Sequence, residues 1–203
     1  MLCAFRLSVV FRRFVRLVSF MACWRHVNVT SIPKGPPSYS VENYLLISIT
    51  SLLSKVFEHL VSARLGRFME RSGVLPTIQF AYRKCLDTCD ALLWVSHTLK
   101  SALESGQQAR IVKIGFSVAF DRVNQKGILY KLCSVGIGGS VLSILTQFLS
   151  NRSQHVMVDG RRSKLVNVLS GVPQGSVSGP LLFPLYTSER FPYSRISRSV
   201  TPL

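Results

Sequence analysis

Cysteine and histidine residues could form a metal site in the first half of the chain. Cys85 and Cys89 are four positions apart, and His97 lies eight positions beyond Cys89. A zinc site needs a fourth ligand at a recognisable spacing, and none follows. The chain has 5 cysteines in all, an odd number at irregular spacing that gives no disulfide framework. We therefore expect free thiols, no metal site and an intracellular protein of the cytoplasm or nucleus.

A large excess of basic residues is the second chemical feature. Lys and Arg number 25 against 9 acidic residues, which gives a formal net charge of +16. This excess favours a polyanionic partner, nucleic acid first and an anionic membrane surface second, with a basic but idle surface as the alternative. The basic residues that we select as nucleic-acid-binding candidates are Lys84, Arg152, Arg161, Arg162 and Lys164.

Three segments combine glycine, aromatic and polar residues in a pattern that identifies a family. They read QFAYRKCLDTCDAL (79–92), ARIVKIGFSVAFDRVN (109–124) and SGVPQGSVSGPLLFPLY (170–186). In this order and at these separations they resemble the fingers motif 2, motif A and motif B of reverse transcriptases. The likeness is to non-LTR retrotransposons (LINE-type, jockey/CR1-like) and covers roughly residues 21–189.

The resemblance implies RNA-directed DNA synthesis, with an RNA template, a DNA primer and Mg²⁺ as cofactor. The family holds the metal with an Asp in motif A and an Asp pair in motif C. Here motif A reads GFSVAFD over 115–121, so Gly115 stands at the position of the metal-binding Asp. Asp121 lies six residues further on, which at half the extended reach is about 10 Å away. For Asp121 we expect a hydrogen-bonding or capping role at the start of the following helix.

Motif C is missing from the sequence. No Asp follows Asp159, no Asp-Asp pair occurs, and residues 190–203 are unlike the family's continuation. The likeness therefore ends before motif C. We expect no intact catalytic residue, no bound metal and no polymerase activity in this chain.

Several residues match family positions that shape the nucleotide site. By resemblance, Phe120 is the steric gate beneath the sugar, with a core Phe as the equal alternative. Gln174 and Gly175 match residues near the incoming nucleotide, and Phe116 would offer its backbone carbonyl to a metal. Arg83 matches a fingers arginine that faces the triphosphate. The nucleotide-binding set implied by the resemblance is Phe116, Phe120, Gln174, Gly175 and Arg83.

Other positions depart from the family pattern. Leu45 and Leu46 replace an Arg-Pro pair, and Cys85 replaces a glycine of motif 2. Ser178 places a hydroxyl where motif B is apolar. Pro184 lies inside an expected apolar helix, where an interior proline costs roughly 3 kcal/mol. Such scattered changes are typical of an inactivated copy.

Periodicity indicates the elements that must position these residues. Apolar spacing predicts a helix between Ser51 and Gly73, and further helices over 88–105, 125–135 and 140–150. The second of these should bury a stripe made of Ala91, Leu92, Val95, Leu99 and Leu103. Residues 110–116 read as a strand. Residues 154–158 and 164–169 read as a hairpin that turns at Asp159-Gly160.

The irregular alternation of helices and strands favours an α+β fold. By resemblance it is the fingers and partial palm of a right-hand polymerase, with an incomplete palm sheet. We divide the chain into a basic, apolar and poorly ordered leader (1–25), a fingers-like region (26–108), a partial palm (109–189) and a non-family tail (190–203). The alternative for the Arg-rich leader is a mitochondrial targeting peptide or an interfacial helix.

Two other interpretations of the whole chain stay open. One is a non-enzymatic remnant that binds nucleic acid through its basic residues. The other is a product with no stable fold, because an unfinished sheet exposes an edge and an apolar face.

Overall fold

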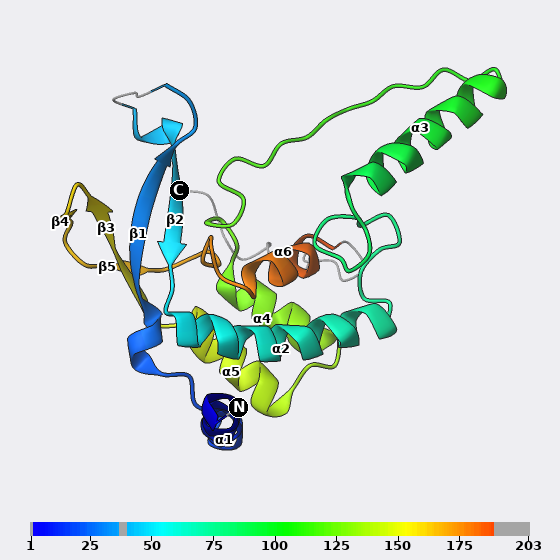
Figure 1. The fold of residues 1–203 in the computed structure, drawn as a ribbon. Helices are drawn as coiled ribbons and strands as arrows, with labels where there is room; N and C mark the ends of the chain where they lie inside the picture. The colour runs from blue at the N-terminus through cyan, green and yellow to red at the C-terminus, as the bar shows by residue number, and fades with distance from the viewer. Residues whose placement is uncertain (1, 37–39, 189–203) are drawn as a thin grey trace, which may run out of the picture.

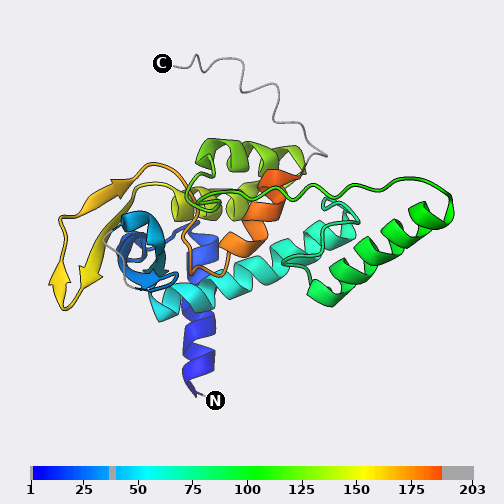
Figure 2. The ribbon, with the colours of Figure 1, turned by 90° about the horizontal axis from the view of Figure 1, so that it is seen from above.

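The computed structural model describes residues 2–36 and 40–188. A small mixed sheet stands beside a group of helices, and one helix projects away from both (Figures 1 and 2). The tail expected at 190–203 lies outside the described residues. The elements in chain order are α1 (Leu2–Arg16), η1 (Ala22–Arg25), β1 (His26–Pro33), η2 (Val41–Asn43), β2 (Tyr44–Ile49), α2 (Leu52–Arg71), α3 (Thr88–Glu104), α4 (Gln125–Ser134), α5 (Gly139–Leu149), β3 (Arg152–Val158), β4 (Arg161–Arg162), β5 (Val166–Val168) and α6 (Gly179–Thr187).

The sheet has the order β2-β1-β3-β4, with β5 also paired to β3. β1 pairs antiparallel with β2 and parallel with β3, so the sheet is mixed. Val27 and Val29 alternate with polar residues along β1 and are buried. The predicted turn at Asp159-Gly160 is confirmed: both residues have positive φ, as a two-residue hairpin turn requires. The returning strand is split into β4 and β5 instead of running over 164–169.

The predicted helices before and after the motif A region are confirmed. α2 begins after Ser51, and Gly73 with φ +56° follows its C-cap. α4 and α5 lie within one or two residues of their expected bounds. Together with α1 and α6 they enclose the main apolar core, whose fully buried side chains include Phe57, Met69, Ile128, Leu132, Leu145, Leu149, Leu182 and Leu185.

The leader is expected to be poorly ordered, but much of it forms a helix. Residues 2–16 form α1, and Phe11 is only 5% exposed, with its ring centroid 5.5 Å from that of Phe57 on α2. Phe14 meets Trp24 edge-on at 5.6 Å. Aromatic burial is a large favourable term, and it fixes this helix on the core despite its basic face. No helix in residues 2–36 or 40–188 combines the length and apolar character needed to cross a membrane.

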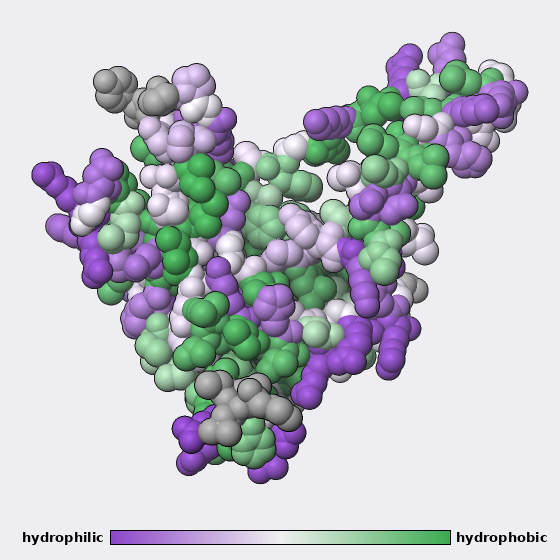
Figure 3. Space-filling view, in the orientation of Figure 1, coloured by the Kyte–Doolittle hydropathy of each residue, from purple (hydrophilic) through white to green (hydrophobic). Residues whose placement is uncertain are grey.

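Two expectations about residues 88–116 are wrong. α3 forms over nearly the predicted residues, but it buries none of them, and Leu92, Leu93 and Leu103 are more than 60% exposed. Residues 107–116, here called the connecting arm, do not form a strand. α3 projects from the molecule and the arm returns from its far end, so no described strand pairs with the arm (Figure 1). Apolar side chains of α3 are visible at the surface in Figure 3.

α6 continues through Pro184 and is anchored by a buried lysine. Pro184 has no N–H, so one bond of this short helix is missing. Lys131, 3% exposed, donates from Nζ to the carbonyls of Tyr186 and Ser188 at the end of the helix. Burial lowers the pKa of Lys131. Tertiary contacts thus stabilise α6 and offset the backbone hydrogen bond that it lacks at Pro184.

Candidate functional site

Motifs A and B meet in a hydrogen-bonded loop cluster. We name it the A/B junction, made of residues 117–124 and 170–178. The N–H of Gly171 donates to the carbonyl of Val123 at 2.7 Å, and the N–H of Val172 to that of Phe120 at 3.0 Å. The Ser170 hydroxyl donates to the Asp121 carbonyl at 3.0 Å. These bonds fix motif A to motif B although the two are some fifty residues apart in sequence.

Two glycines allow the junction to be this close. A Cβ on Gly171 (φ +84°) would lie 2.7 Å from the Cα of Asp121, where no atom fits. A Cβ on Gly175 (φ +106°) would lie 2.6 Å from the carbonyl oxygen of Ser48 on β2. The Ser48 N–H also donates to the Gln174 carbonyl at 2.7 Å. Gln174 and Gly175 therefore lie against the end of β2, with the Gln174 side chain partly exposed.

An aromatic cluster joins all three motifs. The ring of Phe120 stacks on Phe183 of α6 with centroids 5.0 Å apart, and Tyr82 of motif 2 meets Phe120 edge-on at 6.3 Å. Phe116 approaches Phe183 at 6.4 Å but is 70% exposed. The structure thus brings Phe116 and Phe120 together, with Phe120 only partly buried. Both the gate and the core interpretation of Phe120 stay predictions.

A buried acid beneath the junction was not identified from the sequence. Glu58 on α2 is 3% exposed, and its carboxylate accepts the N–H groups of Val177 at 2.9 Å and Ser178 at 3.3 Å. The Ser54 hydroxyl donates to its other oxygen at 3.0 Å. Burial raises the pKa of Glu58 despite these bonds. The i,i+4 spacing of Ser54 and Glu58 along α2 is the sequence signal for this pair.

Arg152 has to be corrected as a surface candidate. It is 4% exposed and lies in the field of Glu58 and Asp121. Burial lowers its pKa to about 10, against the opposing effect of the two carboxylates. In this structure the Arg152 side chain therefore has little surface accessible to a nucleic acid. Arg161, Arg162 and Lys164 are exposed at the tip of the hairpin, and Lys84 is exposed near α2.

Asp121 does not cap α4 as expected. Asn124 is the N-cap, and its side-chain oxygen accepts the N–H of Gly127 at 3.0 Å. Asp121 instead lines a hollow of about 230 Å³ between the sheet and the junction, together with Ser48, Gln154 and Ser170. Partial burial raises the pKa of Asp121, and Arg152 opposes the shift. Asn124, three residues after Asp121, directly precedes the first helical residue, and its side-chain oxygen can therefore accept the free N–H of the first turn.

Arg83 is held within the fold. Its Nε and Nη2 donate to the two carboxylate oxygens of Glu70 at 2.9 and 2.6 Å. Its Nη1 donates to the carbonyls of Pro76 and Gln79 at 3.1 and 3.2 Å. This pairing raises the pKa of Arg83 and lowers that of Glu70. In this conformation the guanidinium fixes the motif 2 loop to α2, and a role toward phosphate would require it to exchange partners.

Two departures from the family pattern have visible consequences. Cys85 has φ +60°, a region where glycine is favoured. Ser178 is 2% exposed, and its hydroxyl lies 3.0 Å from that of Ser62 on α2. The added hydroxyl in motif B is therefore hydrogen-bonded. Cys23, Cys85, Cys89 and Cys133 are free and exposed.

The family model for reverse transcriptase (RNA-dependent DNA polymerase) matches residues 32–192, which include the whole A/B junction. The chain belongs to this family. Its relatives include RNA-directed DNA polymerases of non-LTR retrotransposons of Drosophila melanogaster. The chain is 33% identical over 184 residues to the probable RNA-directed DNA polymerase from transposon X-element, and 30% identical over 184 residues to the RNA-directed DNA polymerase from mobile element jockey. Each match covers 90% of this chain and 20% of the relative, so the chain spans about a fifth of their length.

At the motif A position of the Mg²⁺ site of a reverse transcriptase, Gly115 supplies no carboxylate. Gly115 is exposed, and no atom lies within 4 Å of where its Cβ would be. Among residues 2–36 and 40–188, no three acidic, histidine or cysteine side chains are grouped so as to hold a metal ion. Mg²⁺ needs carboxylate oxygens, and the nearest acid in motif A, Asp121, lines the hollow by the sheet.

Proposed function

We propose that this chain is the fingers and partial palm of a reverse transcriptase that does not polymerise DNA by itself. The fingers correspond to residues 26–108 and the palm to residues 109–189. By descent the activity is RNA-directed DNA synthesis for retrotransposition, with Mg²⁺, an RNA template and a DNA primer. One observation carries the proposal: Gly115 stands where motif A needs its metal-binding carboxylate.

The surroundings of Gly115 support this proposal. Two-metal catalysis requires carboxylates that hold both ions about 4 Å apart. The connecting arm leaves Gly115 exposed and unpaired. The backbone of Asp121 is tied to Ser170 and packed against Gly171, so Asp121 is not free to move into the vacant role. With Gly115 at this position, the chain therefore lacks the motif A carboxylate that two-metal catalysis requires.

Primer extension on an RNA template with Mg²⁺ tests the proposal. We expect no extension by the chain, none by Gly115→Asp alone, and extension by Gly115→Asp joined to a restored motif C segment. Gly115→Asn with the same segment is the matched control, because it has nearly the same shape without the charge. Extension by the unaltered chain would refute the proposal. Failure of every version, with cooperative unfolding intact, would show that further residues are defective.

A second function, nucleic-acid binding without catalysis, is favoured by the exposed cations at the hairpin tip. Arg161, Arg162 and Lys164 lie together there, on a chain of net charge +16. If the three contact three phosphates, log Kd should change by about 2.7 per log unit of salt. A variant with Gln at all three positions should flatten this salt dependence. An unchanged slope in fluorescence anisotropy with a labelled DNA duplex would exclude the hairpin as the contact.

A further inference from the structure

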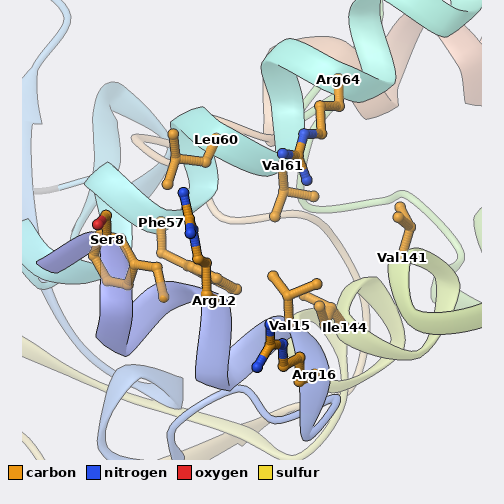
Figure 4. A pocket seen from close by; sticks show the side chains of 11 residues that line it. Ser8, Arg12, Val15, Arg16, Phe57, Leu60, Val61, Arg64, Val141 and Ile144 are labelled. Carbon is orange, nitrogen blue, oxygen red and sulfur yellow. The ribbon is translucent and has the colours of Figure 1, made fainter.

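An apolar pocket opens between α1, α2 and α5, away from the A/B junction. Its volume is about 370 Å³, within the range of small-molecule sites. The floor contains Phe11, Phe57 and Ile144, which are 5%, 1% and 2% exposed. Figure 4 shows these walls coming from three different helices. A ligand placed here would contact side chains that the core already fixes in position.

Three arginines and no acid line the same pocket. Arg12 and Arg16 come from α1 and Arg64 from α2, and all three flank the apolar walls in Figure 4. None of the three has a hydrogen bond or ion pair from its guanidinium to any residue in the described part of the chain. The one other polar lining residue, Ser8, donates its hydroxyl to the Phe5 carbonyl at 2.7 Å.

This combination selects the ligand by charge and by polarity. Like charges around a low-dielectric cavity raise its positive potential, so an anion is attracted. Guanidinium groups bind carboxylate and phosphate oxygens through paired donors. A small inorganic anion would leave the apolar walls uncovered, and a neutral hydrocarbon would gain nothing from the three exposed guanidinium groups.

We propose that the pocket binds an amphipathic anion, with its apolar body against Phe57 and Ile144 and its carboxylate or phosphate head among Arg12, Arg16 and Arg64. The head could belong to a free fatty acid or to a membrane lipid, and the proposal commits to the free molecule. The site does not depend on whether the chain polymerises DNA. Binding would join α1 to the rest of the core through a shared ligand.

Decanoate is a suitable probe, since it is soluble as a monomer and matches both parts of the pocket. Isothermal titration calorimetry of the full chain should give one decanoate per chain. Acetate, which has the head alone, and decyltrimethylammonium, which has the opposite charge, should bind at least tenfold more weakly. Equal binding of decyltrimethylammonium would overturn the proposal, because it would show that only apolar burial drives binding.

Charge-removing variants locate the head. Arg12→Gln and Arg64→Gln should each weaken decanoate binding about tenfold, the usual effect of losing one charged hydrogen bond. Arg110→Gln, on the exposed connecting arm, removes the same charge elsewhere and should leave the affinity unchanged. Equal weakening in all three variants would show a net-charge effect and refute the site.

A filling variant tests the pocket itself without changing charge. Val15→Phe adds bulk beside Ile144 and should reduce decanoate binding, while decanoate should raise the unfolding temperature of the unaltered chain more than that of Val15→Phe. Circular dichroism reports whether the variant is folded. Co-sedimentation with phosphatidylglycerol vesicles, without binding of monomeric decanoate, would overturn the proposal in favour of a membrane-surface role.

Discussion

Motif A is divided between two regions of the molecule that are stabilised very differently. Its second half lies in the A/B junction, where Asp121, Gly171 and Val123 are in backbone contact. Its first half lies in the connecting arm, where Ile111, Val112 and Ile114 are 69–81% exposed. The arm has strand-like residues but no strand beside it. The arm therefore shows that β propensity does not form a strand where no partner strand lies beside it.

The largest effect should come from the junction glycine. Gly171→Ala should lower the free energy of unfolding by about 4 kcal/mol, from backbone strain at φ +84° and loss of the bonds to Val123 and Gln125. Urea denaturation followed by circular dichroism measures this change. The matched control is Gly115→Ala in the arm, which meets nothing within 4 Å and should change stability by less than about 0.5 kcal/mol. Equal losses of stability in the two variants would show that the connecting arm is packed as tightly as the A/B junction.

Paired leucine substitutions extend the comparison to the helices. Leu132→Ala on α4 removes a side chain that is 0% exposed and should cost about 3 kcal/mol, because a cavity is left in the core. Leu93→Ala on α3 removes a side chain that is 72% exposed and should cost less than about 0.5 kcal/mol. Thermal unfolding of both variants measures the difference. A large loss in Leu93→Ala would mean that α3 packs against the core in solution.

Two glutamates on α2 should respond to pH in opposite directions. The pKa of buried Glu58 is raised above its ordinary value of 4.5, so the native state holds its proton more tightly than the unfolded state. Its contribution to stability is therefore lost as pH rises through that raised pKa. Glu70, paired with Arg83, has a lowered pKa, so its contribution is present above pH 4.5 and is lost as pH falls.

Unfolding measured from pH 3 to pH 8 tests these signs. At low pH, Glu58→Gln should be less stable than the unaltered chain, because the substitution alters the hydrogen bonds of this side chain. As pH rises above 4.5, it should gain stability relative to the unaltered chain. Glu70→Gln should lose stability relative to the unaltered chain as pH rises from 3 toward 4.5, by less than about 1 kcal/mol because the pair is partly exposed. Parallel pH profiles for both variants would contradict the opposite shifts.

The sequence predicts local structure well and tertiary placement poorly. Helical spacing with terminal glycines, as at Gly73 and Gly106, locates α2 and α3, and Asp159-Gly160 locates the hairpin turn. The same spacing wrongly predicts burial of α3, because an apolar stripe does not specify whether another element packs against it.

The candidate site shows the same division. The family motifs locate the A/B junction and Gly115, because their chemistry depends on residue type. Charge alone places Arg152 at the surface, whereas β3 carries it inward toward Glu58 and Asp121. The junction's close approaches, of Gly171 to Asp121 and of Gly175 to Ser48, join residues far apart in the chain and have no local signal.

The smallest expected effect comes from the helix N-caps, which are the same type of interaction in the core and in the projecting α3. Asn124 caps α4 in the core, and Asp87 caps α3 through a reciprocal box with Asp90. Each cap is worth about 1 kcal/mol to its helix. Asn124→Ala should lower global stability by that amount, whereas Asp87→Ala should leave the main unfolding transition unchanged. Since α3 buries no residue, its opening is expected to be separate from global unfolding.

Hydrogen exchange distinguishes these outcomes residue by residue. Asp87→Ala should accelerate exchange within residues 88–104 only, and Asn124→Ala should accelerate it across α4, α5 and α6 together. Asp87→Asn, which keeps a capping oxygen, is the control and should restore slow exchange in α3. Faster exchange throughout the core in Asp87→Ala would mean that α3 and the A/B junction unfold as one unit, and that exposure of α3 does not isolate it.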